Sequence, residues 1–322
     1  MMWLAWRQHR RQVLFTGVLL AALAALLVPT GVAMRRSFAA DGLDRCLKLT
    51  GPGDGNCMTL LNQFDNRYGA LMSVGVLLLV LPVLIGLFWG APLVAREVEH
   101  GTHRLVWTQG VSRQRWAAVK FGLVGVGALM ASTVYGLGVT WWLTPLVDAQ
   151  RSARFDEFFF DMQGIVPVGY TLFAVALGVF AGTVWPKVLP AMGAALVGYI
   201  GVRVLVTLFA RPRFLPLEER SIPLQSKEEP DASSDWVVER GVRDADGTMA
   251  IPDAQVHCPL GVSGPDGRPC GEGIGLEAGA YNWQLYQPAD RFWLFQWIET
   301  GVFVALAALL IYLAVRRLRR IA

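Results

Sequence analysis

Long runs of apolar residues alternate with short polar segments along most of the chain. Each run is about as long as the ~20 residues that an α-helix needs to cross the hydrocarbon core of a bilayer. The pattern therefore predicts six transmembrane helices, and Pro82 and Pro92 predict a kink in the second of them. The predicted helices cover residues 13–34, 70–94, 117–146, 164–185, 188–210 and 294–315.

The composition agrees with a membrane protein and excludes an ordinary soluble domain. Of the 322 residues, 54% are hydrophobic, and the mean hydropathy is +0.41. The first apolar run follows a basic start, but Arg35 and Arg36 come directly after it and no convincing small-residue cleavage site is present. We therefore expect a retained helix rather than a cleaved signal peptide. The predicted fold class is an all-α polytopic membrane protein.

The charged residues are sorted between the two sides of the predicted membrane. Lys and Arg gather in the short segments 1–12, 95–116 and 316–322, whose only acids are Glu97 and Glu99. Short loops rich in Lys and Arg stay on the cytoplasmic side. An even number of spans then places both termini, including the tail 316–322, in the cytoplasm of a cell-membrane protein. Residues 1–12 suit either a helix lying in the cytoplasmic interface or a plain basic flank.

The last outer segment, residues 211–293, is large enough for a small extracytoplasmic domain. Residues 236–251 predict a β-hairpin with Asp246 and Gly247 in its turn. Residues 211–235 are rich in Pro, Ser and charge and are typical of an extended connector. The other predicted outer loops are residues 35–69 and 147–163.

All four cysteines lie in predicted outer segments, where disulfides form and persist. Four cysteines allow three pairings, and nearness in the sequence favours joining the first two and the last two. Closing a loop of this size stabilises a fold by about 3 kcal/mol. The alternative is that they are unpaired small apolar residues. The predicted disulfides are Cys46–Cys57 and Cys258–Cys270.

Two glycine pairs have the GxxxG spacing that lets membrane helices approach closely. Gly86 and Gly90 lie in the second predicted helix, and Gly178 and Gly182 lie in the fourth. Because such pairs are common in apolar helices, we expect them to pack within the subunit rather than to form a dimer seam.

Apart from Lys120 at the start of the third predicted span, which belongs with the preceding basic segment, two charges lie inside predicted spans. Arg203 in the fifth helix and Glu299 in the sixth are each about 12 Å of helix inward from the outer end. Lone charges at that depth are costly, so we predict an Arg203–Glu299 ion pair that fixes the last two helices. The alternative is that Arg203 snorkels outward while Glu299 faces a wet cavity.

Motifs for enzymatic chemistry are missing from the sequence. It contains no GxxxxGK[ST] phosphate loop, nucleophile elbow or HExxH motif. His100 and His103 have helical spacing, but two histidines without a third ligand indicate a solvated loop face more than a metal site. We therefore predict no catalytic residues, no metal and no cofactor in this chain, and no nucleic-acid partner.

The basic segment between the second and third spans contains an E-x-E-x-G-T motif, followed by a hydrophobic stretch and V-S-R-x-R. It is the one sizeable polar segment between two long apolar runs that is strongly basic. Its residues are Glu97, Glu99, Gly101 and Thr102, then Leu105, Val106 and Trp107, then Val111, Ser112, Arg113 and Arg115.

This motif, together with six spans and a basic amphipathic start, resembles the type-2 permease subunits of ATP-binding-cassette (ABC) exporters. The opening WLAWRQHRRQ and the stretch YQPADRFWLFQWIETG at residues 286–301 resemble the actinobacterial branch of that family. The sequence departs from the pattern at Gly110, where many relatives have proline, and in its larger last outer segment.

The resemblance implies a half-size permease that pairs with a second copy or a homologue. It also implies two separate cytoplasmic ATPase subunits, which would bind ATP and Mg. Residues around 97–109 would form a coupling helix seated in a cleft of the ATPase, with Glu97 and Glu99 near the helix start, where acids complement the helix dipole. An apolar knob of Leu105, Val106 and Trp107 would fill a pocket of the ATPase. The alternative for the knob is burial against the chain's own helices or the lipid interface.

The predicted function is ATP-driven export of an amphipathic or hydrophobic compound, such as a drug, lipid or peptide. A small ion is disfavoured because the spans lack a chain of charges. One alternative is a membrane sensor or mechanotransmission scaffold that acts on outer partners without moving cargo, which the large outer segment motivates. A membrane-embedded enzyme is the least favoured alternative.

Overall fold

The computed structural model of the chain describes residues 2–43, 45–46, 55–99, 113–150, 154–225, 235–258, 271 and 275–320. Within these residues, six helices are long and apolar enough to cross a membrane, which confirms the predicted number. The helices are α1 (Met2–Ala40), α3 (Gly55–Tyr68), α4 (Met72–Ile85), α5 (Ala91–Glu99), α7 (Arg113–Gln150), α8 (Glu157–Met162), α9 (Val166–Val184), α10 (Val188–Leu205) and α11 (Phe292–Arg320).

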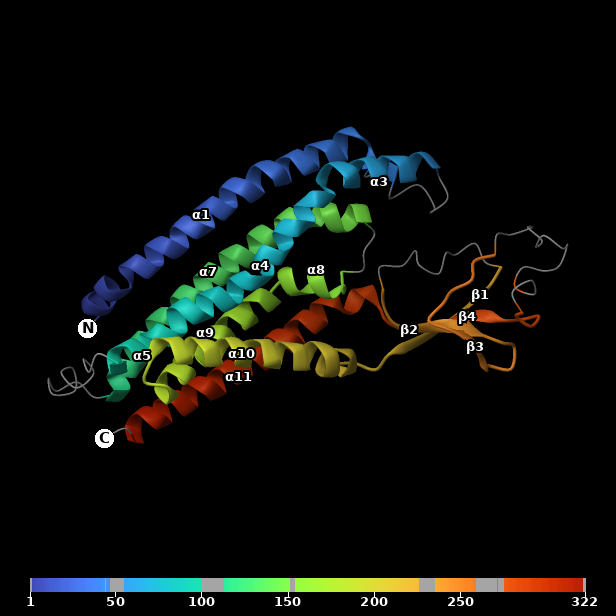
Figure 1. Cartoon of the computed structure of the whole chain (residues 1–322). Helices are drawn as coiled ribbons and strands as arrows, with labels where there is room; N and C mark the ends of the chain where they lie inside the picture. Colours follow the sequence, from blue (N-terminus) through green and yellow to red (C-terminus); the bar gives the residue numbers. More distant parts are fainter. Residues whose placement is uncertain are drawn as a thin grey trace.

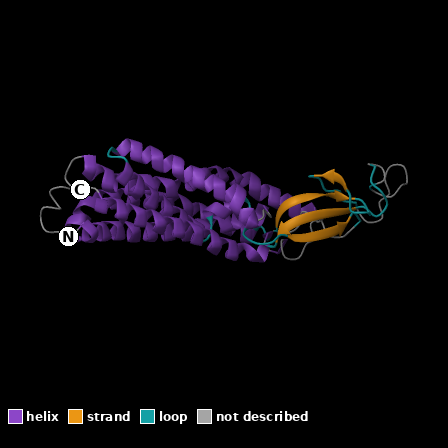
Figure 2. Ribbon diagram, turned by 90° about the horizontal axis from the view of Figure 1, so that it is seen from below, coloured by secondary structure: helices purple, strands orange, loops and turns teal. Residues whose placement is uncertain are grey.

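The molecule is a long helical bundle with a small sheet at one end (Figures 1 and 2). Both termini lie at the end of the bundle opposite the sheet, next to the end of α5 and the start of α7 (Figure 1). The segments with excess basic residues therefore gather at one end, and the predicted outer domain lies at the other. This is the separation that the distribution of charge predicts.

The first span is part of one continuous helix. α1 runs from Met2 to Ala40 with Pro29 inside it, so residues 1–12 do not form a separate helix from the predicted span. Much of its apolar surface, including Phe15 and Val18, is exposed and suits contact with lipid. Hydrogen bonds hold it to the bundle: Trp89 Nε1 donates to Thr16 Oγ1 at 3.0 Å, and Trp142 Nε1 donates to Thr30 Oγ1 at 2.9 Å.

The second span contains the irregularity predicted from its prolines. Between α4 and α5, residues Gly86–Gly90 wind as a π-helix, a form that interrupts α-helices mostly as a single turn. Pro92 has no N–H, so the carbonyl of Phe88, four residues earlier, lacks its helical donor. The side-chain amide of Gln12 in α1 supplies a donor instead, at 3.1 Å from the Phe88 oxygen.

α9 is the central helix and is buried along most of its length. It meets the second span through the predicted glycine pairs. A Cβ atom on Gly86 would lie 2.4 Å from Ala174 Cβ, and one on Gly178 would lie 2.7 Å from Ala91 N. Only glycine lets the two backbones come this close. The prediction that these pairs pack within the subunit is confirmed.

The predicted outer domain contains a four-stranded antiparallel sheet with the strand order β1-β4-β2-β3. The predicted hairpin is present as β2 and β3, and Gly247 in its turn has a φ of 87°. The backbone N–H of Thr248 donates to Asp246, which lowers the pKa of that carboxyl group. The strands are β1 (Glu218–Pro223), β2 (Trp236–Arg243), β3 (Met249–Pro252) and β4 (Tyr281–Gln287).

The prediction of an extended connector over residues 211–235 is wrong in part. Residues Glu218–Pro223 form β1, which pairs with β4 from Glu218 opposite Tyr286 to Pro223 opposite Tyr281. Local composition hides this strand because its partner lies about 60 residues away, so only the folded arrangement supplies its hydrogen bonds.

Aromatic side chains join the sheet to the bundle. Phe155, from the segment before α8, stacks on Trp236 of β2 with ring centroids 5.8 Å apart. The same ring meets Phe295 of α11 edge to face at 5.2 Å, an arrangement that adds to the burial of apolar area. The base of the sheet is therefore packed against α11.

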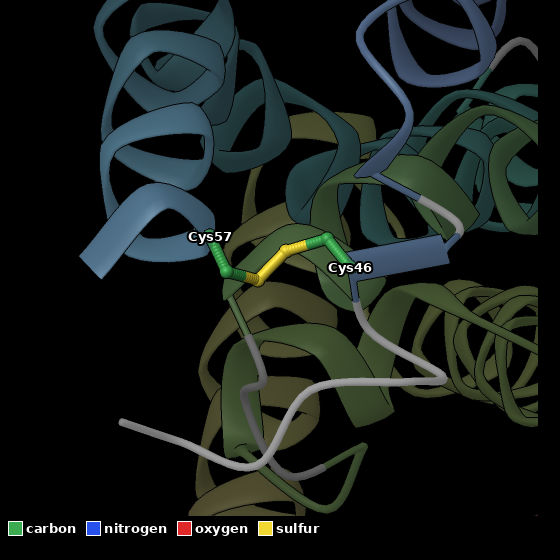
Figure 3. Close-up of a disulfide and its surroundings, with 2 residues drawn as sticks. All are labelled: Cys46 and Cys57. Carbon is green, nitrogen blue, oxygen red and sulfur yellow. A yellow bond between two sulfur atoms is a disulfide. The ribbon is translucent and has the colours of Figure 1, made fainter. Parts of the chain in front are cut away.

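The predicted disulfide Cys46–Cys57 is confirmed (Figure 3). It joins the segment after α1 to the start of α3, with the two Cα atoms 5.6 Å apart. Cys258 is also disulfide-bonded, and Cys270 lies outside the described residues. The bridge thus joins the two described segments on either side of residues 47–54.

Candidate functional site

Four charged side chains meet at the end of the bundle nearest the sheet. The guanidinium group of Arg211 binds Glu299 through two hydrogen bonds, Nε to Oε2 and Nη2 to Oε1, each 2.8 Å long. Arg211 Nη2 also donates to Asp161 Oδ1 at 2.6 Å, and Arg203 pairs with the other oxygen of Asp161. Such two-point contacts between arginine and a carboxylate are strong and geometrically specific.

Tyr170 of α9 completes this ionic cluster. Its hydroxyl oxygen lies 2.5 Å from Glu299 Oε1 and 3.0 Å from Asp161 Oδ1. Because a phenol has one proton, it donates to one of these carboxylates at a time. The ring of the same tyrosine lies under the guanidinium group of Arg203, 3.6 Å from its Cζ to the ring centroid. Tyr170 therefore contacts both ion pairs.

The cluster is buried and balanced in charge. Glu299 is 0% exposed and Arg211 is 1% exposed. A buried charge is tolerated only when it is paired and hydrogen-bonded, and here two arginines face two carboxylates. The cluster joins α8, α9, α10 and α11 with the segment that follows α10. It therefore holds together the two helices, α10 and α11, between which the sheet domain is inserted.

The predicted direct ion pair between Arg203 and Glu299 is not formed. The structure brings both residues into one cluster, but Arg203 pairs with Asp161 and Glu299 pairs with Arg211. The reason is the short irregular segment after α10. Residues Val206–Ala210 form a π-helix and Arg211–Arg213 form a 3₁₀ turn, which directs Arg211 into the bundle instead of toward the outer segment.

The sequence carries weak signals for the residues that the prediction missed. Asp161 is an isolated acid in the apolar run of residues 158–162, and its depth inside the molecule depends on the helix α8 that carries it. Arg211 precedes Pro212 and looks like the first residue of the outer segment. Tyr170 is one aromatic residue among many in an apolar helix, so nothing in the pattern distinguishes it.

At the opposite end of the bundle, Glu97 and Glu99 contact two other helices. Glu97 forms an ion pair with Lys120 of α7. Glu99 Oε2 accepts a hydrogen bond from the backbone N–H of Val188 at 3.2 Å. Val188 is the first residue of α10, and its N-cap residue Lys187 supplies no side-chain hydrogen bond. Glu99 therefore complements the positive N-terminal end of α10.

The predicted coupling helix around residues 97–109 is described only as far as Glu99, so the position of Glu97 and Glu99 near its start stays a prediction. They lie in the last turn of α5, which ends at Glu99. The other predicted coupling residues, Gly101, Thr102, Leu105, Val106 and Trp107, lie outside the described residues, as do His100 and His103. Within the described part of the chain, no group of three or more His, Cys, Asp or Glu residues is placed to hold a metal ion.

The comparisons with known proteins agree with the helical architecture. A family model described as "ABC-2 membrane transporter related" matches residues 17–211, which is more than half of the chain. The match includes Asp161, Tyr170, Arg203 and Arg211 but ends before the sheet and α11. Neither the curated proteins nor the solved structures contain a match to this chain. The chain is a multi-pass membrane protein that belongs to the ABC-2 membrane transporter related family.

Proposed function

We propose that this protein is the permease subunit of an ABC exporter that moves an amphipathic or hydrophobic compound, such as a drug, lipid or peptide. It works with a second permease copy or a homologue and with two cytoplasmic ATPase subunits, which bind ATP and Mg. The chain itself has no enzymatic role. Both termini lie in the cytoplasm, and the opening and 286–301 motifs support the actinobacterial branch of the family.

The observation that carries the proposal is the position of the E-x-E-x-G-T segment in a chain of this family. α5, which carries the two acids of the segment, ends at Glu99, at the end of the bundle where both termini lie (Figure 1). Its two acids contact α7 and the start of α10. A force applied to this segment by an ATPase is thus delivered directly to two further helices.

Co-purification with the cognate ATPase tests the proposal. The double variant Leu105→Asp/Trp107→Asp is expected to lose the ATPase, because a charge in a buried apolar contact is strongly unfavourable. Met249→Asp, an exposed substitution on β3 at the other end of the molecule, is the control and is expected to retain the ATPase. Retention of the ATPase by a folded double variant, or failure of wild type to bind any ATPase, would contradict the coupling role of this segment.

A second candidate function is mechanotransmission to an outer partner without transport. One observation favours it. The apolar helical segment Val188–Arg213 has 26 residues and is about 39 Å long. It begins at the contact with Glu99, carries both arginines of the ionic cluster and leads into β1. Only a small share of its apolar window is buried in the subunit. The segment therefore connects the inner loop to the sheet domain.

Spin labels separate the two candidates in a reconstituted permease–ATPase complex. Labels on Ala250 of β3 and on Val197 of α10 would report movement of the sheet relative to the bundle. An exporter is expected to move an amphipathic dye into sealed vesicles when ATP is hydrolysed. An ATP-dependent change of the label distance without movement of any tested dye would favour mechanotransmission instead.

A further inference from the structure

An apolar groove of about 340 Å³ lies between the first half of α1 and α7. Its size is at the lower end of the range for small-molecule sites. Almost all of its lining is apolar, and the polar exceptions are Gln12 and Thr16. The groove follows α1 from Gln12 to Leu20, which corresponds to a length of about 12 Å.

The walls of the groove are fixed by contacts described above. Gln12 is bonded to the carbonyl of Phe88, and Thr16 accepts from Trp89. The ring of Trp89 lies over Gly127 of α7, since a Cβ atom there would be 2.7 Å from the ring. These contacts place the indole ring of Trp89 between Thr16 of α1 and Gly127 of α7. The groove between the two helices is therefore formed by specific side-chain contacts of the fold.

The groove opens toward the outside of the bundle. Val126 and Met130, on the α7 side of the groove, are 61% and 64% exposed. Gly17, on the α1 side, has no atom within 4 Å of the position that a Cβ would occupy. An occupant can therefore enter sideways from the surrounding membrane. In that environment the available occupants are the tails of lipids.

The charge at one end of the groove identifies the class of lipid. Arg10 is exposed and lies two residues before Gln12 in α1, and the sequence adds Arg7 and Arg11 to the same basic stretch. The sequence contains no acid before Asp41, so the charged residues of α1 are all basic. Basic clusters beside membrane helices attract the anionic headgroups of phospholipids.

We propose that the groove binds a phospholipid with an anionic headgroup. One acyl chain lies between α1 and α7, where it removes apolar surface from exposure, and the headgroup lies at the basic start of α1, which includes the exposed Arg10. α1 is the least buried of the spanning helices. The bound lipid therefore adds apolar contacts between α1 and the rest of the bundle and stabilises the position of α1. This role is independent of the cargo and of the ATPase.

Native mass spectrometry of the full chain in detergent tests the proposal, with phosphatidylglycerol and phosphatidylcholine of the same acyl chains as probes. Wild type is expected to retain phosphatidylglycerol preferentially, by about fivefold for each arginine that contacts the headgroup. Gly17→Phe fills the groove and is expected to abolish this binding. Gly201→Phe is the matched control, because Gly201 on α10 also has open space at its Cβ position and lies away from the groove.

Two further variants separate the parts of the site. The triple variant Arg7→Gln/Arg10→Gln/Arg11→Gln is expected to bind both phospholipids equally. Met130→Trp narrows the groove from the α7 side and replaces Gly17→Phe if that variant does not fold. Equal binding of the two phospholipids by wild type, an unchanged preference in the triple variant, or full binding by folded groove-filling variants would overturn the proposal.

Discussion

Replacing Arg211 with methionine is expected to lower the free energy of unfolding by about 3–5 kcal/mol, the range seen when one partner of a buried ion pair is removed. Arg211 is 1% exposed and supplies the two hydrogen bonds that neutralise Glu299, which is 0% exposed. Methionine leaves that carboxylate buried without its cation. Thermal or denaturant unfolding of the purified protein in detergent measures the loss.

Arg213 provides the control for this prediction. It lies in the same 3₁₀ turn, but its side chain is exposed and bonds to the carbonyl of Phe209 in its own chain segment. Arg213→Met is therefore expected to change the stability by less than about 1 kcal/mol. Equal losses in the two variants would show that the turn, and not the ionic cluster, determines the effect.

The double variant Arg211→Met/Glu299→Met distinguishes coupling from simple loss of volume. If the two residues act as a pair, the double variant loses less than the sum of the two single variants, because no unpaired charge remains between them. Asp161 keeps Arg203 as its partner in all three variants. Additive losses would mean that the two charges are stabilised independently.

Gly178→Val is the second change with a large expected effect. The new Cβ would lie 2.7 Å from Ala91 N and 2.8 Å from Gly86 O. Both neighbours are backbone atoms of the second span, so no flexible side chain can move to relieve the clash. We expect a loss of more than about 3 kcal/mol, at the upper end of overpacking effects. Little folded protein should remain after extraction and size-exclusion chromatography.

Gly193→Val is the matched control, since it makes the same chemical change in a helix with open space around the site. No atom lies within 4 Å of the Cβ position of Gly193, which is exposed on α10. The folded yield is expected to match that of wild type, because valine is at least as good a helix former as glycine. Normal yield of Gly178→Val would show that α9 and the second span can separate without loss of the fold.

The two substitutions with large expected effects, Arg211→Met and Gly178→Val, disrupt different kinds of contact around α9. α9 packs by its glycines on the second span and places Tyr170 in the ionic cluster with α11. Glu99 links the second span to the start of α10, while the cluster joins α10 and α11 at the end nearest the sheet. In the proposed exporter, the cluster would thus be the fixed end about which α10 tilts.

The local pattern of residues by itself determined the number of spans, the glycine pairs, the Asp246–Gly247 turn and the Cys46–Cys57 disulfide. Each of these depends on neighbours in the sequence: hydrophobic length, helical spacing, turn chemistry or a short loop. The same local reasoning found two members of the ionic cluster, Arg203 and Glu299, because a charge inside an apolar run is conspicuous.

Only the tertiary structure decided how these parts are joined. The partner of a buried charge depends on the rotation of each helix and on irregular turns, so Arg211 and Asp161 replaced the expected direct pair. The strand β1 requires hydrogen bonds from β4, which lies far away in the sequence. The groove beside Gly17 is formed where the Trp89 ring lies between α1 and α7. Each of these features is set by packing between distant segments, which hydrophobic periodicity does not encode.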